Sequence, residues 1–403
     1  MRIAILAEAY PKNMGYAGTQ LPKALAKLGA EVHYVTAGLP AYTMMADFKE
    51  TYGKFPAGLG PGTKKEEYEG YTVHFLPHRI QLGYVRMLGI LEKLREIKPD
   101  IVQTFSPISW GPLNAALIKR RLGYGLFTGN HTTASVFPLA RRSSHPWEME
   151  RIKNLLTRTI CGRFVSLSTE KCYAATTDCG YVATTFLGVP EDKIDVLPLG
   201  VDTDVFFPAV STKDIQERAD VRKELGFAPD DILCIYTGRF ATDKNPLLLA
   251  QAVEKLGAKT KPFRCLFVGE GVQAEAISRC ARSVVRKFVP FFELAKYYRA
   301  ADIGVWPTQE STSMLDAAAC GLPVIVNNTL KAVERIEGNG AQYRLNDLDD
   351  LVCVLERFED PCLRKHLGNS GANKMASHFS WRALAQRRLT DYELFVRNRG
   401  RRR

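Results

Sequence analysis

Long apolar runs are missing from this sequence, and with them any stretch of the roughly 18 residues that a membrane-spanning helix needs. The chain also does not open with the basic, apolar and small-residue regions of a signal peptide, because residues 2–9 are typical of a strand. None of the nine cysteines precedes Cys161 and no two form a Cys-x-x-Cys pair, which argues against a disulfide framework and a zinc site. These absences predict a cytosolic protein with reduced, packed thiols.

The sequence has no Gly-x-x-x-x-Gly-Lys-Ser/Thr motif, which excludes P-loop kinases, and no aromatic platform or helix motif of a nucleic-acid module. Its formal charge is +12 and its pI is near 9.2. This surplus favours anionic partners such as acidic lipid headgroups or a phosphorylated substrate, without choosing among them. Besides the terminal RNRGRRR, the basic residues that stand out are Lys119, Arg120, Arg121, Arg141, Arg142, Arg151, Lys153, Arg158 and Arg163.

At 403 residues, 46% of them hydrophobic, the chain can bury two domain cores. Strands alternate with helices in both halves, which predicts parallel sheets built from crossover units. The expected fold is α/β, with two doubly wound Rossmann-like domains facing a cleft, at residues 1–205 and 206–380, and a C-terminal helix with a basic tail at 381–403. The expected strands are residues 2–9, 31–36, 71–76, 101–105, 126–128, 194–197, 232–236, 265–268, 286–289 and 303–306. The expected helices are residues 19–28, 113–122, 149–160, 246–256, 273–282 and 294–300.

The stretch Trp306–Asn327 predicts a strand, a polar turn, an Ala-rich helix and a further strand. Glu310 and the hydroxyl residues Ser311–Ser313 lie where this helix begins, so free backbone N–H groups and the positive helix end would favour an anion. Asp316, about one turn into the helix, could accept hydrogen bonds from a sugar diol. The alternative is a simple helix cap with a solvated Asp316.

Other candidate residues follow other predicted strands. Arg239 and Lys244, in GRFATDKNP, are two cations on a tight loop that can converge on one anion. His131, in GNHTT, is either structural or part of a ligand site. Gly15 and Gly18 allow close backbone approach to a phosphate, although a plain turn explains them nearly as well.

Two short motifs are weaker. VGEGVQA matches a dinucleotide-binding pattern through Gly269 and Glu270, but it follows the second strand of its domain and not the first. Asp202 and Asp204 form an Asp-x-Asp triplet of the kind that binds a metal with a nucleotide, but the triplet opens the linker between the domains. We therefore expect no cofactor and no obligatory metal.

Taken together, Gly15–Gly18, His131, GVDTDVFFP, GRFATDKNP, VGEGV and DAAACGLPVI resemble, in order and spacing, the GT-B glycosyltransferases of family 4, which are retaining and nucleotide-sugar-dependent. The resemblance spans essentially the whole chain, including an FSW motif at 379–381 whose helix crosses back onto the N-terminal domain in that family. It implies a retaining hexosyltransferase that takes a UDP- or GDP-linked sugar. The acceptor, a lipid-linked compound or a saccharide such as a cell-envelope glycan, would lie on the N-terminal domain and the donor on the C-terminal domain.

The resemblance also implies roles for individual residues. Arg239 and Lys244 would hold the donor diphosphate and act in catalysis, and His131 would lie near the donor sugar. A glycine loop would approach the phosphates, and Gly269 and Glu270 are further donor-binding candidates.

The helix that carries Asp316 would meet the nucleotide ribose, with Ser311 and Thr312 at its start. The family pattern is Glu, seven residues, Glu, and counting back from Asp316 reaches Thr308. Glu310 is the nearby carboxylate, so we predict that it takes the first glutamate's catalytic role.

Many members of this family use lipid-linked acceptors at the inner membrane. The cationic run from Lys119 to Arg163 therefore predicts association of the N-terminal half with anionic membranes, against the alternative of a merely solvated surface. Other classes stay open: a different GT-B-like nucleotide-sugar enzyme such as an epimerase, which would need an acid/base set beside His131, or a degenerate binding protein.

Overall fold

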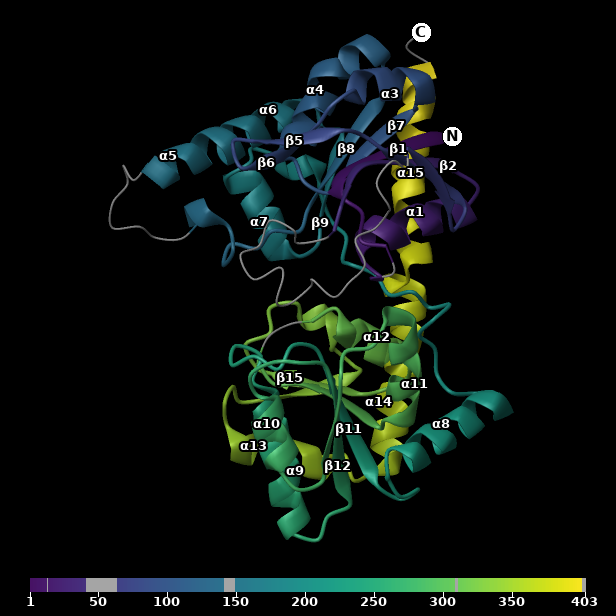
Figure 1. The fold of residues 1–403 in the computed structure, drawn as a ribbon, viewed down its shortest axis with the longest axis vertical. Coiled ribbons are helices and arrows are strands. Elements are labelled where there is room, and N and C mark those ends of the chain that lie inside the picture. Colours follow the sequence, from purple (N-terminus) through teal and green to yellow (C-terminus); the bar gives the residue numbers. More distant parts are fainter. Residues whose placement is uncertain (13, 41–63, 141–148, 309–310, 401–403) are drawn as a thin grey trace. The chain divides into compact units, whose positions relative to one another are not determined.

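The computed structural model describes residues 1–12, 14–40, 64–140, 149–308 and 311–400. Its contacts divide the chain into two compact units, Met1–Leu199 with Leu384–Arg403 and Gly200–Ala383 (Figure 1). Each unit has its own largely parallel sheet with helical connections, so the predicted doubly wound α/β fold is confirmed. Within the described ranges, no helix is both long enough and apolar enough to cross a bilayer.

The first unit is built around an eight-stranded sheet in the order β10-β9-β8-β7-β1-β2-β4-β3. Neighbouring strands are parallel, except that β3 pairs antiparallel with β4 at one edge. The carboxyl ends of the parallel strands therefore share one edge of the sheet. The strands are β1 Arg2–Ala9, β2 Glu31–Leu39, β3 Lys65–Tyr68, β4 Tyr71–Phe75, β7 Ile101–Thr104, β8 Gly125–Asn130, β9 Lys171–Ala174 and β10 Ile194–Val196.

The helices of the first unit connect these strands. In α1, Leu21, Ala24 and Leu25 are buried at the i, i+3, i+4 spacing of a helix face that packs on a sheet. A separate hairpin pairs β5 His78–Gln81 with β6 Tyr84–Met87. The helices are α1 Ala17–Lys27, α3 Ile90–Ile97, α4 Trp110–Leu122, η1 Pro138–Ala140, α5 Met149–Asn154, the π-helical η2 Leu155–Ile160, α6 Cys161–Ser168, α7 Thr177–Thr185 and η3 Glu191–Lys193.

The second unit has a six-stranded, fully parallel sheet in the order β13-β12-β11-β14-β15-β16. Its strands are β11 Ile232–Thr237, β12 Phe263–Val268, β13 Ser283–Arg286, β14 Ile303–Trp306, β15 Val324–Asn327 and β16 Gly340–Tyr343. Its helices are α8 Thr212–Glu224, α9 Pro246–Ala258, α10 Ala274–Arg279, η4 Phe291–Glu293, α11 Leu294–Ala300, α12 Ser313–Ala319, η5 Val333–Arg335, α13 Leu348–Arg357, α14 Pro361–Lys374 and the π-helical η6 Met375–Phe379.

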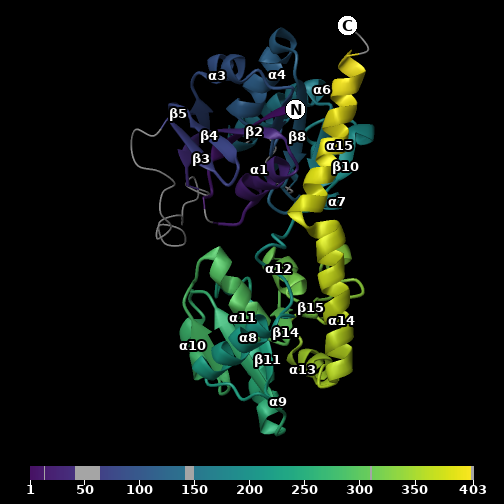
Figure 2. The same cartoon turned by 90° about the vertical axis from the view of Figure 1, so that its right-hand side faces the viewer.

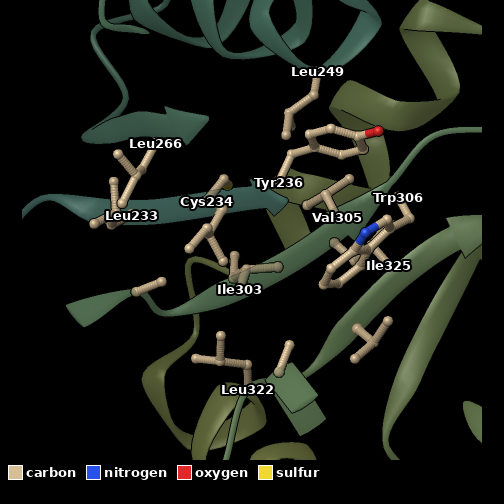
Figure 3. Packing of buried hydrophobic residues seen from close by; sticks show 14 of the residues in the cluster. Leu233, Cys234, Tyr236, Leu249, Leu266, Ile303, Val305, Trp306, Leu322 and Ile325 are labelled. Atoms are coloured by element: carbon tan, nitrogen blue, oxygen red, sulfur yellow. The ribbon is translucent and has the colours of Figure 1, made fainter. Parts of the chain in front are cut away.

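The core of the second unit lies on both faces of its central strands. Every residue of β11 and β14 is buried, as expected for a sheet with helices on both faces. Figure 3 shows Tyr236 and Trp306 packed among branched aliphatic side chains of this core. The indole N–H of Trp306 donates to the Thr237 carbonyl oxygen at 3.2 Å. This contact fixes the ends of β11 and β14, from which the candidate site extends.

The C-terminal helix α15 Trp381–Gly400 docks on the first unit from Leu384 onward, beside β8 and β10 (Figure 2). The Tyr392 hydroxyl donates to Gln103 Oε1 at 2.6 Å, and Asp391 accepts from Lys171 Nζ at 2.6 Å. A Cβ on Gly125 would lie 2.7 Å from the Phe395 ring, so only glycine admits this aromatic side chain at the start of β8.

Three predicted elements differ clearly from the structure in their bounds. The strand expected at 286–289 lies at Ser283–Arg286, because its partner β12 ends at Val268, which pairs with Arg286. The helix expected at 273–282 is shorter, Ala274–Arg279. The predicted helix 149–160 continues through η2 into α6 and ends at Ser168.

Candidate active site

Three loops meet at the carboxyl edge of the second sheet, after β11, β12 and β14. The Phe240 backbone N–H, in the loop after β11, donates to the Glu270 carbonyl oxygen after β12 at 2.8 Å. The Thr308 hydroxyl, after β14, donates to the Asp243 carbonyl oxygen at 2.8 Å. These bonds join neighbouring strand ends into one rigid platform, and Arg239 lies on its central loop.

Arg239 and Lys244 lie on this central loop. Arg239 is exposed, and its Nη2 is 3.9 Å from Asp243 Oδ2, a long contact that leaves the guanidinium donors accessible. Its carbonyl oxygen accepts from the Tyr236 hydroxyl at 2.9 Å, which holds the backbone beneath the charged group. Lys244 is half-buried just before Pro246, the first residue of α9. The loop thus presents cations beside a helix start, where anions bind favourably.

The glycines of VGEGV have a packing role. Gly269 and Gly271 have φ values of 154° and 150°. A Cβ on Gly269 would lie 1.9 Å from the Gly238 carbonyl oxygen, and one on Gly271 would lie 2.6 Å from that of Phe240. The two glycines therefore let the β12 loop lie directly against the backbone that carries Arg239.

The predicted strand, helix and strand of Trp306–Asn327 are confirmed as β14, α12 and β15. Ser311 lies just before Thr312, the N-cap residue of α12, and its Oγ accepts from the Ser313 backbone N–H at 3.3 Å. Thr312 is exposed beside it. Glu310, predicted to be catalytic, lies outside the described residues. Counting by the family spacing reaches Thr308, which has no carboxyl group. Its hydroxyl instead bonds to the Asp243 carbonyl oxygen and so connects its loop with the loop that carries Arg239.

Asp316 lies in α12, half-buried and close to Asp202. Burial, and secondly the Asp202 carboxylate, raise the pKa of Asp316 well above its usual range. Asp202 is itself buried and closes its own turn, because its Oδ1 accepts from the Asp204 backbone N–H at 3.1 Å. Asp316 is therefore a carboxyl group short of partners for its charged form, and sugar hydroxyl donors would favour ionisation.

The first unit carries the remaining candidates at the carboxyl edge of its own sheet. Gly15 has a φ of 68°, in the left-handed region that favours glycine. A Cβ on Gly18 would lie 2.9 Å from the Tyr34 hydroxyl, which itself donates to the Ala9 carbonyl oxygen at 2.9 Å. The two glycines thus shape a turn and let α1 approach the end of β1.

His131 directly follows β8. Its ring centroid is 6.0 Å from that of Phe105, and the preceding Asn130 is anchored through its Nδ2, which donates to the Cys179 carbonyl oxygen at 2.8 Å. His131 is exposed at the surface. Its pKa is nevertheless lowered, first by desolvation from the surrounding protein and secondly by the guanidinium of Arg388. The imidazole is therefore neutral at neutral pH and can both donate and accept a hydrogen bond.

A further carboxyl group, which was not predicted from the sequence, lies at the carboxyl edge of the first unit's sheet. Glu8, near the end of β1, is hydrogen-bonded by the hydroxyl of Ser109, at the start of α4. Burial raises the pKa of Glu8, with the Ser109 hydrogen bond acting in the opposite direction. Ser109 has a φ of 106°, a conformation that serine rarely adopts and that the surrounding structure must hold. Strained backbone beside a buried acid is typical of functional sites.

Two doubly wound units with parallel strands and polar groups at their carboxyl edges are the architecture of the GT-B class. Comparison with known families agrees. Residues 231–358 match the model of glycosyl transferases group 1, and residues 19–205 match that of Glycosyltransferase Family 4. The chain belongs to the GT-B glycosyltransferases of family 4, which transfer a sugar from a nucleotide-sugar donor.

Individual relatives support the same family. The D-inositol 3-phosphate glycosyltransferase of Segniliparus rotundus is 28% identical over 70% of this chain and 63% of its own length. The D-inositol 3-phosphate glycosyltransferase of Xylanimonas cellulosilytica is 27% identical over 94% of this chain and 91% of its own length. A GDP-mannose-dependent monoacylated alpha-(1-6)-phosphatidylinositol monomannoside mannosyltransferase of Corynebacterium glutamicum is 27% identical over 47% of this chain and 54% of its own length.

The fold is also similar to a solved structure, the sucrose-phosphate synthase from Thermosynechococcus elongatus. That structure is 16% identical and matches 99% of this chain and 100% of its own with a TM-score of 0.69.

Proposed function

We propose that this enzyme transfers a hexosyl group from a UDP- or GDP-linked sugar to an acceptor that carries an inositol phosphate, with retention of the anomeric configuration and without an obligatory metal. The observation that carries the proposal is the position of Arg239 and Lys244 on a loop that two neighbouring strand-end loops hold in place. Such a fixed pair of cations suits a diphosphate better than a mobile surface pair does.

The chemistry follows from where charge develops. The bond from the anomeric carbon to the diphosphate oxygen breaks, a bond from the acceptor oxygen forms on the same face, and the acceptor proton passes to the departing phosphate. Negative charge grows on the leaving group in this step. Arg239 and Lys244 would stabilise it through charge-assisted hydrogen bonds, in the role that a metal ion has in other transferases.

The carboxyl and imidazole groups orient the donor in this proposal. Asp316 would accept hydrogen bonds from the ribose diol, which would lower its raised pKa in the complex. Neutral His131 would bond to a hydroxyl of the donor sugar. Glu310, outside the described residues, keeps its predicted role beside the reacting sugar.

The acceptor is proposed from the relatives. The names of both kinds of relative include an inositol phosphate group, as D-inositol 3-phosphate in one and as a monoacylated phosphatidylinositol monomannoside in the other. The net charge of +12 is consistent with a phosphorylated acceptor. A panel of UDP- and GDP-linked hexoses, each offered with inositol 3-phosphate or phosphatidylinositol, tests the proposal. Transfer supports it, epimerised donor would indicate a different nucleotide-sugar enzyme, and an unchanged panel would indicate a binding protein.

A further inference from the structure

The first sheet reverses its strand order between β1 and β7. From β1 the chain continues outward through β2 in one direction, and from β7 it continues through β8 in the other. The connections after β1 and β7 therefore turn away from each other, and ligands bind at such points in open α/β sheets. In the second sheet the equivalent point lies between β11 and β14, whose loops carry Arg239 and Thr308.

Glu8 and Ser109 lie at this reversal point, and we name them the Glu8–Ser109 pair. Glu8 is one residue before the end of β1, and Ser109 follows β7 as the N-cap residue of α4. The serine hydroxyl donates to Glu8 Oε1. A carboxylate has about four acceptor sites, and in the described part of the chain no other side chain bonds to Glu8 and no lysine or arginine pairs with it. Both residues are half-buried, so the pair keeps hydrogen-bonding capacity for a ligand.

Ser109 reaches Glu8 in an unfavourable conformation. Its φ of 106° and ψ of 175° fall in a region that is essentially restricted to glycine. A serine at an N-cap normally accepts a hydrogen bond from a backbone N–H of the first helical turn, but the Ser109 side chain makes no such bond. Both local preferences are lost while the hydroxyl is directed at a carboxyl group. A strained residue beside an acid is typical of a binding site.

The surroundings hold the pair in a fixed position. The Thr36 hydroxyl donates to the Glu8 carbonyl oxygen at 3.2 Å. The indole N–H of Trp110, the residue after Ser109, donates to the Gln81 carbonyl oxygen at 3.1 Å. The two strand-end segments are thus anchored independently of the bond between them. A preorganised pair of this kind loses little conformational entropy when a ligand binds.

The chemistry of the pair selects its ligand. A carboxyl group beside a hydroxyl group can accept hydrogen bonds from, and donate them to, neighbouring hydroxyls of a polyol. Burial raises the pKa of Glu8, and hydroxyl donors from a ligand would favour its charged form. A phosphate would instead be repelled by this carboxylate, whereas cations such as Arg239 in the second unit attract one. The pair therefore suits an uncharged, hydroxyl-rich group.

We propose that the Glu8–Ser109 pair binds ring hydroxyls of a polyol acceptor, with Glu8 as a residue that determines acceptor specificity. The inference deepens the proposed function, on which it rests for the inositol-containing acceptor. In this arrangement the acceptor ring presents its hydroxyls to the carboxyl edge of the first sheet, and its phosphate lies away from Glu8.

The acceptor phosphate would then bind cations at a separate place. In the cationic run predicted from the sequence, Lys119 is already paired with Glu170 at 2.6 Å. Arg141 and Arg142 lie outside the described residues. The inference therefore concerns the acceptor hydroxyls alone.

The first test is steady-state transfer kinetics with inositol 3-phosphate and the UDP- or GDP-linked hexose selected by the donor panel. Glu8→Gln keeps the side-chain size and an oxygen for the Ser109 hydroxyl, but it replaces the other acceptor oxygen by an N–H donor. Ser109→Gly removes the hydroxyl and relieves the strained conformation. The matched control is Glu92→Gln, which neutralises an exposed acid on α3 of the same unit.

We expect Glu8→Gln to raise the acceptor KM about tenfold or more, since a hydrogen bond to a charged group is lost. The donor KM and the slow hydrolysis of donor without acceptor should equal those of wild type and control. Ser109→Gly should also raise the acceptor KM without lowering the midpoint of urea unfolding, a combination that a purely structural serine would not give. An unchanged acceptor KM in Glu8→Gln, or a raised donor KM instead, would overturn the inference.

The second test needs neither donor nor transfer. Saturation-transfer difference NMR with myo-inositol should give a ligand signal for wild type and control that is lost in Glu8→Gln. If the wild type transfers no sugar but shows this signal and its loss, the proposed function is wrong and the pair is still a polyol site. A signal of equal strength in Glu8→Gln would contradict the inference even where transfer succeeds.

Discussion

At the scale of single residues, the account depends most on Arg239 and Lys244. Arg239→Ala and Lys244→Ala should each reduce turnover strongly, since removal of one charge-assisted donor at a developing anion costs about 2.7–4 kcal/mol of transition-state stabilisation. Both side chains lie on a loop whose backbone is bonded by other residues, so the variants should stay folded. Steady-state kinetics of transfer or of slow donor hydrolysis measures the effect.

Arg279→Ala is the matched control, because Arg279 is an exposed cation on α10 of the same unit, paired with Glu275 one turn away. Its turnover should equal that of the wild type. If Arg239→Ala and Lys244→Ala also retained near-wild-type rates, the diphosphate clamp would be wrong.

Glu8 gives a prediction about pH. Burial raises its folded-state pKa, so the native state holds the proton more tightly than the unfolded chain does. The stability that this proton contributes is fully present below the unfolded-state pKa and is lost as pH rises through the folded-state value. Glu8→Gln should therefore raise the midpoint of thermal unfolding at alkaline pH, with a gain that shrinks toward acidic pH. A gain that is constant across pH would mean that the Glu8 proton is not the cause.

Candidate site residues could be predicted from the sequence only where they directly follow a predicted strand, since ligands bind at the carboxyl ends of parallel strands. Arg239 and Lys244 follow a largely apolar strand that is fully buried, and a charged residue there has few structural reasons to exist. Glu8 could not be found in this way, because it lies inside the strand pattern of β1 and its environment depends on Ser109, 101 residues later.

At the scale of elements, the contact between the loops after β11 and β12 controls the position of Arg239. Gly271→Ala would place a Cβ 2.6 Å from the Phe240 carbonyl oxygen, and we expect it to cost about 1–3 kcal/mol of stability as overpacking does. It should also reduce turnover, because the loop that carries Arg239 must shift. Urea unfolding and transfer kinetics of the same preparation measure both effects.

Gly226→Ala separates backbone strain from the loop contact. Gly226 has a φ of 77° with nothing within 4 Å of the added Cβ, so this variant should lose only about 1–2 kcal/mol for the left-handed conformation and keep its activity. Equal loss of activity in both variants would show that the contact between the loops does not position Arg239.

Most elements of the parallel sheets were predictable because their strands are short apolar runs bounded by turn residues. β3, β9, β16 and the hairpin β5–β6 were not predicted. β9 is only Lys171–Ala174, and its strand state comes from pairing with β8 on one side and β10 on the other. Hairpin residues such as Arg79 and Gln81 alternate weakly in polarity and have no apolar run to mark them. Tertiary pairing, and not local preference, decides these segments.

At the scale of the whole molecule, two features were readable from the sequence: the repeated alternation of strands and helices, and a set of modest motifs in fixed order. The family resemblance implied that the C-terminal helix crosses back onto the N-terminal domain, and α15 belongs to the first unit from Leu384 onward. The individual contacts of this helix could not be read from the sequence, such as the bond from Tyr392 to Gln103 across 289 positions.

The most direct test of the account is a transfer reaction with excess EDTA, using the UDP- or GDP-linked hexose selected by the donor panel and an inositol-phosphate acceptor. The account predicts a glycosylated product whose anomeric configuration, read by NMR, matches that of the donor. It also predicts that product formation persists in EDTA, since Arg239 and Lys244 take the charge of the leaving diphosphate, and falls in their alanine variants. Activity that disappears in EDTA and returns with magnesium or manganese, or a product of inverted configuration, would contradict it.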